Sequence, residues 1–194
     1  MNKHRKQFEF SPIAGELKGR IVRTPDLGVT RPPLSRLRKA IFDYLVPYLP
    51  GAHYLDLFSG SGSYLFEAIS RGAERAEGVE KEPKLAGAIN REASRLGVTD
   101  RLEYRCDDVF DAIPEYHRRG LTFDVIMIAP PQYQGLIDRT LATLKRHPVS
   151  RTEARIIAQH DTSERAIDWG GFAVEQQRKY GNTTFTVLRP DESS

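Results

Sequence analysis

A loop of small residues and three carboxylates have the types and spacing to bind a nucleotide-like cofactor. The stretch LDLFSGSGSYLFEA, residues 55–68, has the pattern of a strand, a glycine-serine loop and a helix. Gly60 and Gly62 let the backbone approach a ligand, and the helix that follows offers free N–H groups at its amino terminus. Leu65 occupies the position of the third glycine of a dinucleotide loop. This residue disfavours a bound pyrophosphate.

An S-adenosylmethionine site would use the same loop to bind an ammonium, a carboxylate and ribose hydroxyls. Asp56, at the end of the first strand, could accept from the ammonium or orient the loop through a water. Glu80 ends the second strand, about 20 residues after the loop, where a carboxylate can accept from both ribose hydroxyls. Asp108, after the third strand, could accept from the adenine amino group. Each of the three could instead be an ordinary cap or turn residue.

A second candidate site follows the apolar run FDVIMI at residues 123–128, and it consists of Ala129, Pro130, Pro131, Gln132 and Tyr133. Methylation of an exocyclic amine requires its lone pair to point at the methyl donor, and acceptors on the amine hydrogens enforce that geometry. The prolines stiffen the turn and leave the Pro130 carbonyl without a local donor. Gln132 could supply an amide oxygen, and Tyr133 could stack on a base. Alternatively, the prolines only end a buried strand and Tyr133 packs on the surface.

The elements around these residues predict an α/β fold. The apolar residues between 34 and 48 recur at helical spacing, and from His53 onward strands alternate with helices at about 63–71, 83–96 and 134–146. This alternation is typical of a parallel sheet with helices on both faces. The tail GFAVEQQRKYGNTTFTVLRP predicts an antiparallel pair at the sheet edge, and PIAGELKGRIVRT, residues 12–24, predicts a small amino-terminal hairpin. We expect residues 1–50 to form a basic extension and residues 51–194 to form the cofactor-binding domain.

Positive charge is concentrated near the amino terminus. Residues 1–40 contain ten Lys or Arg and three acidic residues, although the net charge of the chain is only +3. Such asymmetry favours contact with a polyanion, because phosphate contacts supply affinity that does not depend on sequence. A solvated basic face is the alternative. The candidate phosphate contacts are Arg20, Arg31, Arg36 and Arg38.

The composition is that of a soluble globular protein, with 39% hydrophobic and 28% charged residues. The single cysteine, Cys106, excludes an internal disulfide framework, and the five histidines lack metal-ligand spacing, so we expect no metal. The opening MNKHRKQFEF lacks the apolar segment of a secretory signal, and no apolar run is long enough to span a bilayer. We therefore expect a cytoplasmic protein, and a monomer.

With these residues in place, the chain resembles the bacterial 16S ribosomal RNA guanine-N2 methyltransferase family over about residues 13–189. The order and spacing of several blocks are more specific than any single block. They are IAGELKGR at 13–20, RPPLSRLRKAIFDYL at 31–45, LDLFSGSGSYLFEAISRGA at 55–73, VEKEP at 79–83, FDVIMIAPPQYQGL at 123–136 and KYGNTTF at 179–185.

The resemblance implies a class I S-adenosylmethionine-dependent methyltransferase fold: a Rossmann-like, mostly parallel sheet that ends in an antiparallel hairpin, plus a small amino-terminal β-hairpin. It implies S-adenosylmethionine as cofactor and 16S ribosomal RNA, or the assembling small subunit, as partner. The implied cofactor residues are Asp56, Phe58, Ser59, Gly60, Gly62, Glu80, Lys81 and Asp108, although Phe58 could equally belong to the core.

The sequence departs from the family pattern at the proline motif. The family has an acidic or amide residue, two prolines and an aromatic residue, whereas this chain has Ala129 before the prolines and Gln132 after them. Three alternatives to the activity of this family stay open. The chain could be a catalytically silent protein that retains cofactor or RNA binding, an N-methyltransferase for another RNA or DNA amine, or a nicotinamide-dependent oxidoreductase, which Leu65 disfavours.

Overall fold

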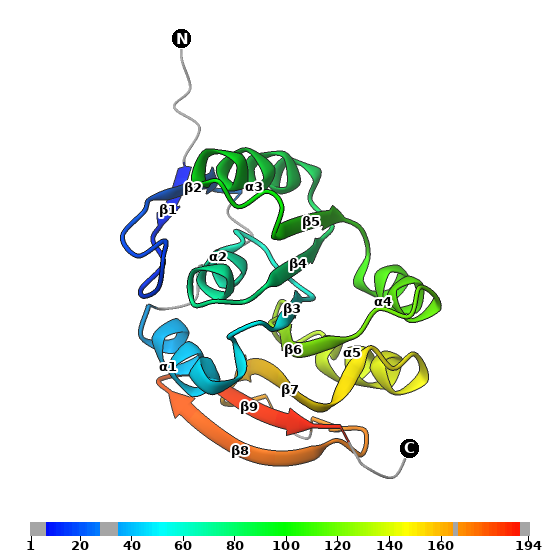
Figure 1. Cartoon of the computed structure of the whole chain (residues 1–194). Helices are drawn as coiled ribbons and strands as arrows, with labels where there is room; N and C mark the ends of the chain where they lie inside the picture. Colours follow the sequence, from blue (N-terminus) through cyan, green and yellow to red (C-terminus); the bar gives the residue numbers. More distant parts are fainter. Residues whose placement is uncertain (1–6, 28–34, 165–166, 191–194) are drawn as a thin grey trace.

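The computed structural model describes residues 7–27, 35–164 and 167–190 (Figure 1). Its helices are α1 (Ser35–Leu45), the short 3-10 helix η1 (Val46–Tyr48), α2 (Ser63–Ser70), α3 (Pro83–Leu96), α4 (Val109–Arg118) and α5 (Leu136–Arg146). Its strands are β1 (Gln7–Phe10), β2 (Val22–Pro25), β3 (His53–Asp56), β4 (Arg75–Glu80), β5 (Leu102–Cys106), β6 (Phe123–Ile128), β7 (Ser150–Asp161), β8 (Ala173–Tyr180) and β9 (Thr183–Arg189).

The central sheet confirms the predicted fold class. Its seven strands have the order β5-β4-β3-β6-β7-β9-β8. Strands β3 to β7 pair in parallel, whereas β9 is antiparallel to β7 and β8 is antiparallel to β9. The antiparallel tail lies at the predicted edge.

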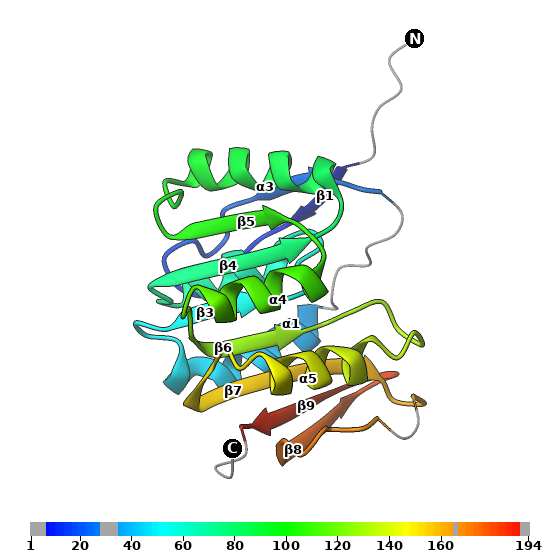
Figure 2. The ribbon, with the colours of Figure 1, turned by 90° about the vertical axis from the view of Figure 1, so that its right-hand side faces the viewer.

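Helices cover both faces of this sheet. Helices α1, α2 and α3 enclose one core with residues such as Val125 and Met127 of β6, and α4 and α5 enclose the other with Ile126 and Ile128. Figure 2 shows α4 and α5 in front of the sheet and α1 behind it. Burial on both faces explains why residues 125–128 of β6 are all apolar, because a strand with one solvated face would alternate apolar and polar residues.

The amino-terminal hairpin has different bounds from those predicted. Strands β1 and β2 pair antiparallel with Phe10 opposite Val22, and residues 11–21 form the connecting loop, which was predicted to contribute strands. This loop contacts the end of α2: the Glu16 N–H donates to the Ser70 carbonyl (2.8 Å). Gly15 has φ +84°, and a Cβ there would lie 1.6 Å from the Ser70 carbonyl oxygen. Only glycine permits so close an approach of the two backbones.

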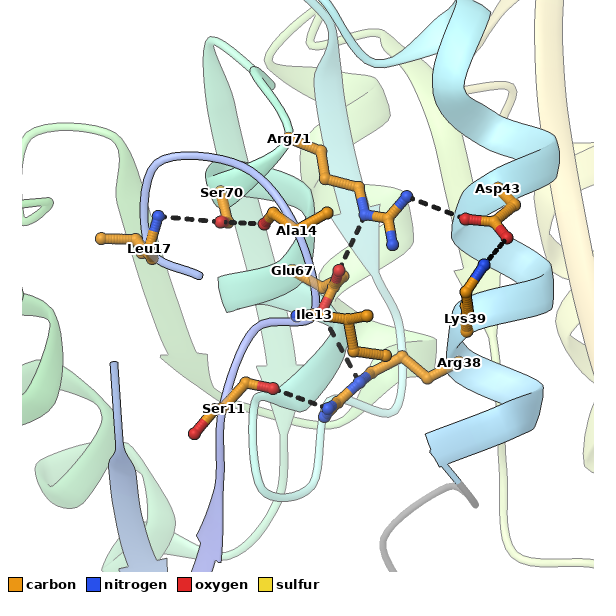
Figure 3. A network of polar contacts seen from close by, with 10 residues as sticks. All are labelled: Ser11, Ile13, Ala14, Leu17, Arg38, Lys39, Asp43, Glu67, Ser70 and Arg71. Carbon is orange, nitrogen blue, oxygen red and sulfur yellow. Dashed lines mark hydrogen bonds and ion pairs between the residues drawn. The ribbon is translucent and has the colours of Figure 1, made fainter. Parts of the chain in front are cut away.

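A buried polar network fixes the same loop to α1 and α2 (Figure 3). Glu67 of α2 is fully buried, accepts from the Ile13 N–H (2.9 Å), and forms ion pairs with Arg71 (2.7 Å) and Arg38 (3.6 Å). Arg38 also donates to the Ser11 carbonyl (2.7 Å). Burial lowers the pKa of the Arg38 guanidinium below its ordinary value, and the charge of Glu67 opposes that shift. The network therefore holds three segments of the chain together.

The hairpin and α1 share the core of the neighbouring sheet face. Phe10, Leu37 and Phe42 pack in the same buried cluster as Leu65 of α2. The division of the chain into an extension of residues 1–50 and a domain of residues 51–194 stays a prediction.

Candidate active site

The strand ends that carry the predicted site residues meet at one edge of the sheet. Strands β3 to β7 are parallel, so their last residues lie at the same edge, which the β8–β9 turn also reaches (Figure 2). The chain reverses its direction of winding between β3 and β6, because β3 is flanked by β4 on one side and by β6 on the other. Open α/β sheets bind ligands at this topological switch point.

The glycine-serine loop after β3 is held by its own polar groups. Ser59 is buried, and its hydroxyl donates to the Asp56 carbonyl (2.9 Å) and the Val79 carbonyl (3.2 Å). The Tyr104 hydroxyl donates to the Gly60 carbonyl (3.1 Å). Gly62 has φ +75° at the start of α2, a conformation that side chains rarely adopt. The loop is therefore preorganised where β3 and β4 end.

Asp56 has the strongest signature of a ligand contact. Its side chain is fully buried, and Oδ2 has no hydrogen-bond partner among the residues that the structure describes, while Oδ1 accepts a long bond from the Phe58 N–H (3.4 Å). Burial, and to a smaller extent the charge of Glu80, raises the pKa of Asp56 to about 7. A buried oxygen without a donor requires an explanation. An ammonium group, bound directly or through a water, would supply that donor, so this residue fits the implied cofactor.

Glu80 closes β4 directly beside the loop. Its Oε2 accepts from the Gly60 N–H (3.2 Å), and its Oε1 accepts from the backbone N–H groups of Lys81 (2.8 Å) and Glu82 (3.2 Å). A carboxylate offers about four lone-pair sites, so these three bonds orient it and leave capacity for a hydroxyl donor. Its position therefore fits the predicted ribose contact.

Asp108 has a structural role that the sequence left open. It is the N-cap of α4, where Oδ1 accepts from the Phe110 N–H (2.8 Å) and Oδ2 pairs with Lys81 Nζ (2.6 Å). Burial raises the pKa of this carboxyl, but the hydrogen bonds from Lys81 and Phe110 outweigh burial and lower it below its ordinary value. A contact between Asp108 and adenine stays a prediction. Phe58 is half-buried and packs against the core under α4 and α5.

The proline motif begins where β6 ends. Ala129 is half-buried and packs against the core of α1, α2 and α3, while Pro130 is buried and Pro131 is exposed. Gln132 is half-buried, and Tyr133 is 64% exposed. The backbone of Tyr133 has φ +60°, which is uncommon for a residue other than glycine. The motif thus presents an aromatic ring at the edge of the sheet.

Sequence reasoning missed a partly buried hydrogen bond beside Ala129. The Tyr64 hydroxyl of α2 donates to Gln159 Oε1 of β7 (2.6 Å). Ile128 pairs with Ala158, so Ala129 and Gln159 each lie one residue beyond the same pair of strand residues. No local pattern could have revealed this bond, because its partners are 95 residues apart.

A cavity of about 330 Å³ adjoins the proline motif, and it was also missed. It is lined by residues from the proline loop, the end of β7 and the β8–β9 turn: Tyr133, Asp161, Thr162, Ser163, Lys179 and Asn182. The sequence signals were the proline motif, which contains Tyr133, and the block KYGNTTF, which contains two of these residues.

The predicted phosphate contacts separate into three groups. Arg20 and Arg36 are exposed. Arg38 is only 5% exposed and is committed to Glu67 and Ser11, so in this structure it is not accessible to a phosphate. The prediction overlooked that a charged helix residue can face a buried partner. Arg31 lies outside the described residues.

Two negative observations apply to the part of the chain that the structure describes. No group of three or more His, Cys, Asp or Glu side chains there is arranged to hold a metal ion. None of the helices in the same residues has the length and apolarity to cross a membrane.

Comparison with known proteins identifies the family. The family model described as "Conserved hypothetical protein 95" matches residues 12–189. The ribosomal RNA small subunit methyltransferase D of Escherichia coli is 26% identical over 158 residues, which cover 81% of this chain and 78% of that protein. The protein of the same name from Haemophilus influenzae is 24% identical over 182 residues, covering 93% of this chain and 94% of its own.

Solved structures agree with this assignment. A hypothetical protein of Thermus thermophilus is 27% identical and superposes with a TM-score of 0.80 over 93% of this chain and 99% of its own. An RNA methyltransferase of Salinibacter ruber, crystallised with S-adenosyl-L-homocysteine, has a TM-score of 0.66 at 19% identity and covers 84% of this chain and 97% of its own. The second likeness shows that the fold is that of class I S-adenosylmethionine-dependent methyltransferases. The resemblance seen in the sequence is thereby confirmed, and the chain belongs to the conserved hypothetical protein 95 family, with curated relatives named ribosomal RNA small subunit methyltransferase D.

Proposed function

We propose that this protein transfers a methyl group from S-adenosylmethionine to N2 of a guanine in 16S ribosomal RNA. The observation that carries the proposal is that two carboxylates lie together at the topological switch point: Asp56, which has an unpartnered buried oxygen, and Glu80, which is oriented by backbone N–H groups. The names of the curated relatives support a ribosomal RNA substrate. A cytoplasmic location and a single copy of the chain belong to the same proposal.

The site residues divide the work of binding the cofactor. Asp56 holds the ammonium, directly or through a water, Glu80 accepts from the ribose hydroxyls, and the loop containing Gly60 passes beneath them. When bound, S-adenosylmethionine supplies an electrophilic methyl group on a sulfonium. Binding at β3 and β4 leaves the ends of β6 and β7 and the start of β9 for the base.

The proline loop positions the acceptor of the methyl group. The loop would hold the guanine so that the N2 lone pair faces the methyl group that bound S-adenosylmethionine would supply, and N2 would give up one proton to solvent. The Pro130 carbonyl and the Gln132 amide oxygen are the candidate acceptors for the amine hydrogens in the motif, because Ala129 provides none. The exposed ring of Tyr133 stacks on the extruded base in this proposal.

Basic residues on the amino-terminal side hold the RNA backbone in this proposal. Arg20 and Arg36 are exposed on the loop of the hairpin and on α1. Their contacts would be to phosphates and would contribute affinity and orientation without reading sequence.

A second candidate function is cofactor and RNA binding without catalysis. Ala129 favours it, because a lost oriented acceptor costs a few kcal/mol of transition-state stabilisation if nothing replaces it.

Incubation with radiolabelled S-adenosylmethionine and small-subunit particles that lack the modification distinguishes the two functions. We expect label in N2-methylguanosine after digestion to nucleosides, and its loss with the Glu80→Ala variant. Absence of label from a protein that binds S-adenosylmethionine in calorimetry would support the silent binding function. Label in another nucleoside would refute the guanine-N2 assignment.

A further inference from the structure

The cavity beside the proline motif carries an inference that deepens the proposed function and rests on it. Its six lining residues come from three segments that are far apart in the sequence and meet at the carboxyl edge of the sheet. Tyr133 contributes from the loop after β6, and its hydroxyl lies 3.1 Å from Ser163 Oγ across the cavity lining. The cavity therefore adjoins the residues expected to receive the base.

Among the described residues that line this cavity, Asp161 is the only one with a carboxylate. Its Oδ1 accepts from both the N–H (2.8 Å) and the hydroxyl (2.6 Å) of Ser163. These two bonds, together with a hydrogen bond from Tyr133, lower the pKa of Asp161 below its ordinary value. The group is thus an ionised, oriented acceptor at neutral pH. Both Ser163 bonds are made by Oδ1, and the Tyr133 hydroxyl can bond Ser163 Oγ (3.1 Å) in place of the carboxylate, which leaves lone-pair sites on Oδ2 for a ligand.

The other lining residues suit a nucleotide. The Tyr133 ring is exposed, and the backbone of this loop residue has the left-handed conformation. Lys179 and Asn182 are exposed at opposite ends of the β8–β9 turn and can donate to a phosphate or to a base edge. Aromatic stacking together with polar readout of the base edge is the usual mode by which proteins recognise an unstacked base.

Guanine differs from the other bases in the donors of its Watson–Crick edge. Its N1–H and one N2 hydrogen point in the same direction, so a single carboxylate can accept from both. Adenine and cytosine have an acceptor nitrogen in place of N1–H, which a carboxylate would repel. An ionised Asp161 therefore selects guanine by its charge and its acceptor geometry.

We propose that this cavity holds the extruded guanine and that Asp161 reads its N1–H and one N2 hydrogen. Asp161 thereby supplies from β7 the side-chain acceptor that Ala129 lacks at the end of β6. Asp161 is therefore a specificity residue. Of the two hydrogens on N2, it accepts from the one that the methyl group does not replace, and it thereby orients N2 toward the methyl donor.

The test uses 2-aminopurine, which keeps the N2 amine but has an acceptor at N1. Two stem-loop RNAs carry either guanine or 2-aminopurine as the single unpaired purine. The wild-type protein and the Asp161→Asn variant are compared in competition binding, which 2-aminopurine fluorescence reports. We expect the wild type to prefer the guanine RNA by about tenfold or more, because a site built around a donor rejects an analogue that lacks it. An asparagine amide can donate to N1 and accept from N2, so Asp161→Asn should reduce or reverse the preference.

The control is Asp100→Asn, an exposed residue in the turn before β5, which should leave the preference unchanged. An unchanged preference in Asp161→Asn, from a protein with wild-type circular dichroism, would overturn the inference. Transfer of label to guanine is measured with the same protein preparations and small-subunit particles that lack the modification. A shifted preference without transfer would support the cavity and refute the proposed function. Transfer without a shifted preference would support the proposed function and refute the assignment of the cavity to guanine.

Discussion

Replacement of Glu67 by glutamine tests whether the buried network holds the amino-terminal loop on the domain. The substitution keeps the shape of the side chain and an acceptor for the Ile13 N–H, but removes the negative charge that faces Arg38 and Arg71. Glu67 is fully buried, and the side chains of Arg38 and Arg71 are 6% and 8% exposed. Water therefore cannot replace the lost partner.

The size of the effect follows from this burial. Removal of one partner of a buried ion pair costs about 3–5 kcal/mol, because the remaining charge is left uncompensated. For a chain of this length, 1 kcal/mol shifts the melting temperature by about 2–4 °C, so we expect Glu67→Gln to lower it by about 6–20 °C. The pair need not add net stability in the wild type, since burial already lowers the pKa of Arg38.

Urea unfolding followed by circular dichroism measures this loss. Glu9→Gln is the matched control: it makes the same chemical change in the ion pair with Arg23, whose side chains are 46% and 52% exposed. Exposed pairs contribute about 0–1 kcal/mol. A loss in Glu67→Gln no larger than in the control would refute the reasoning about the network.

Three further predictions concern the cofactor, the loop and the RNA. Affinity for S-adenosylmethionine should rise with pH up to about 7 and then level off, since Asp56 must lose its proton to hold the ammonium. Below that pH, calorimetry should show about a tenfold loss of affinity per pH unit, and Asp56→Asn should abolish the pH dependence. Gly15→Ala places a Cβ 1.6 Å from a backbone oxygen, so limited proteolysis should cut the loop after residue 10 faster than in the wild type, and equal rates would contradict the docking. Arg36→Ala should reduce the slope of log affinity for RNA against log salt by about 1; Arg75→Ala, at the opposite edge of the sheet, should leave it unchanged.

Much of the fold was readable from local patterns. The run FDVIMI predicted a strand, and the alternation of strands with helices predicted a parallel sheet covered on both faces; β6 is such a strand between β3 and β7. The bounds of the hairpin were not readable, because the backbone of the loop is satisfied by Ser70, which lies more than fifty residues away. A pattern read along the chain contains no trace of such a partner.

Burial of charged residues was the second feature that could not be predicted from the sequence. Helical periodicity places Arg38 among the solvated residues of α1, and only the neighbouring helix reveals that Glu67 faces it. Asp161 was missed for a related reason: it lies near the proline loop because β7 pairs with β6, and the cavity is completed only where β9 returns beside β7 and brings the β8–β9 turn to the same edge. By contrast, the strand-end positions of Asp56 and Glu80 could be predicted, because strand ends in a parallel sheet share an edge regardless of side-chain detail; their contacts with the cofactor stay a prediction.

A crystal structure of the protein with S-adenosyl-L-homocysteine tests the central claim most directly, because it locates the cofactor relative to the two carboxylates. We predict the amino group of the ligand on Asp56 Oδ2, directly or through one water, and the ribose hydroxyls on Glu80, with the cavity at Asp161 open toward the sulfur. A ligand bound elsewhere, or one that leaves Asp56 Oδ2 without a donor, would contradict the account.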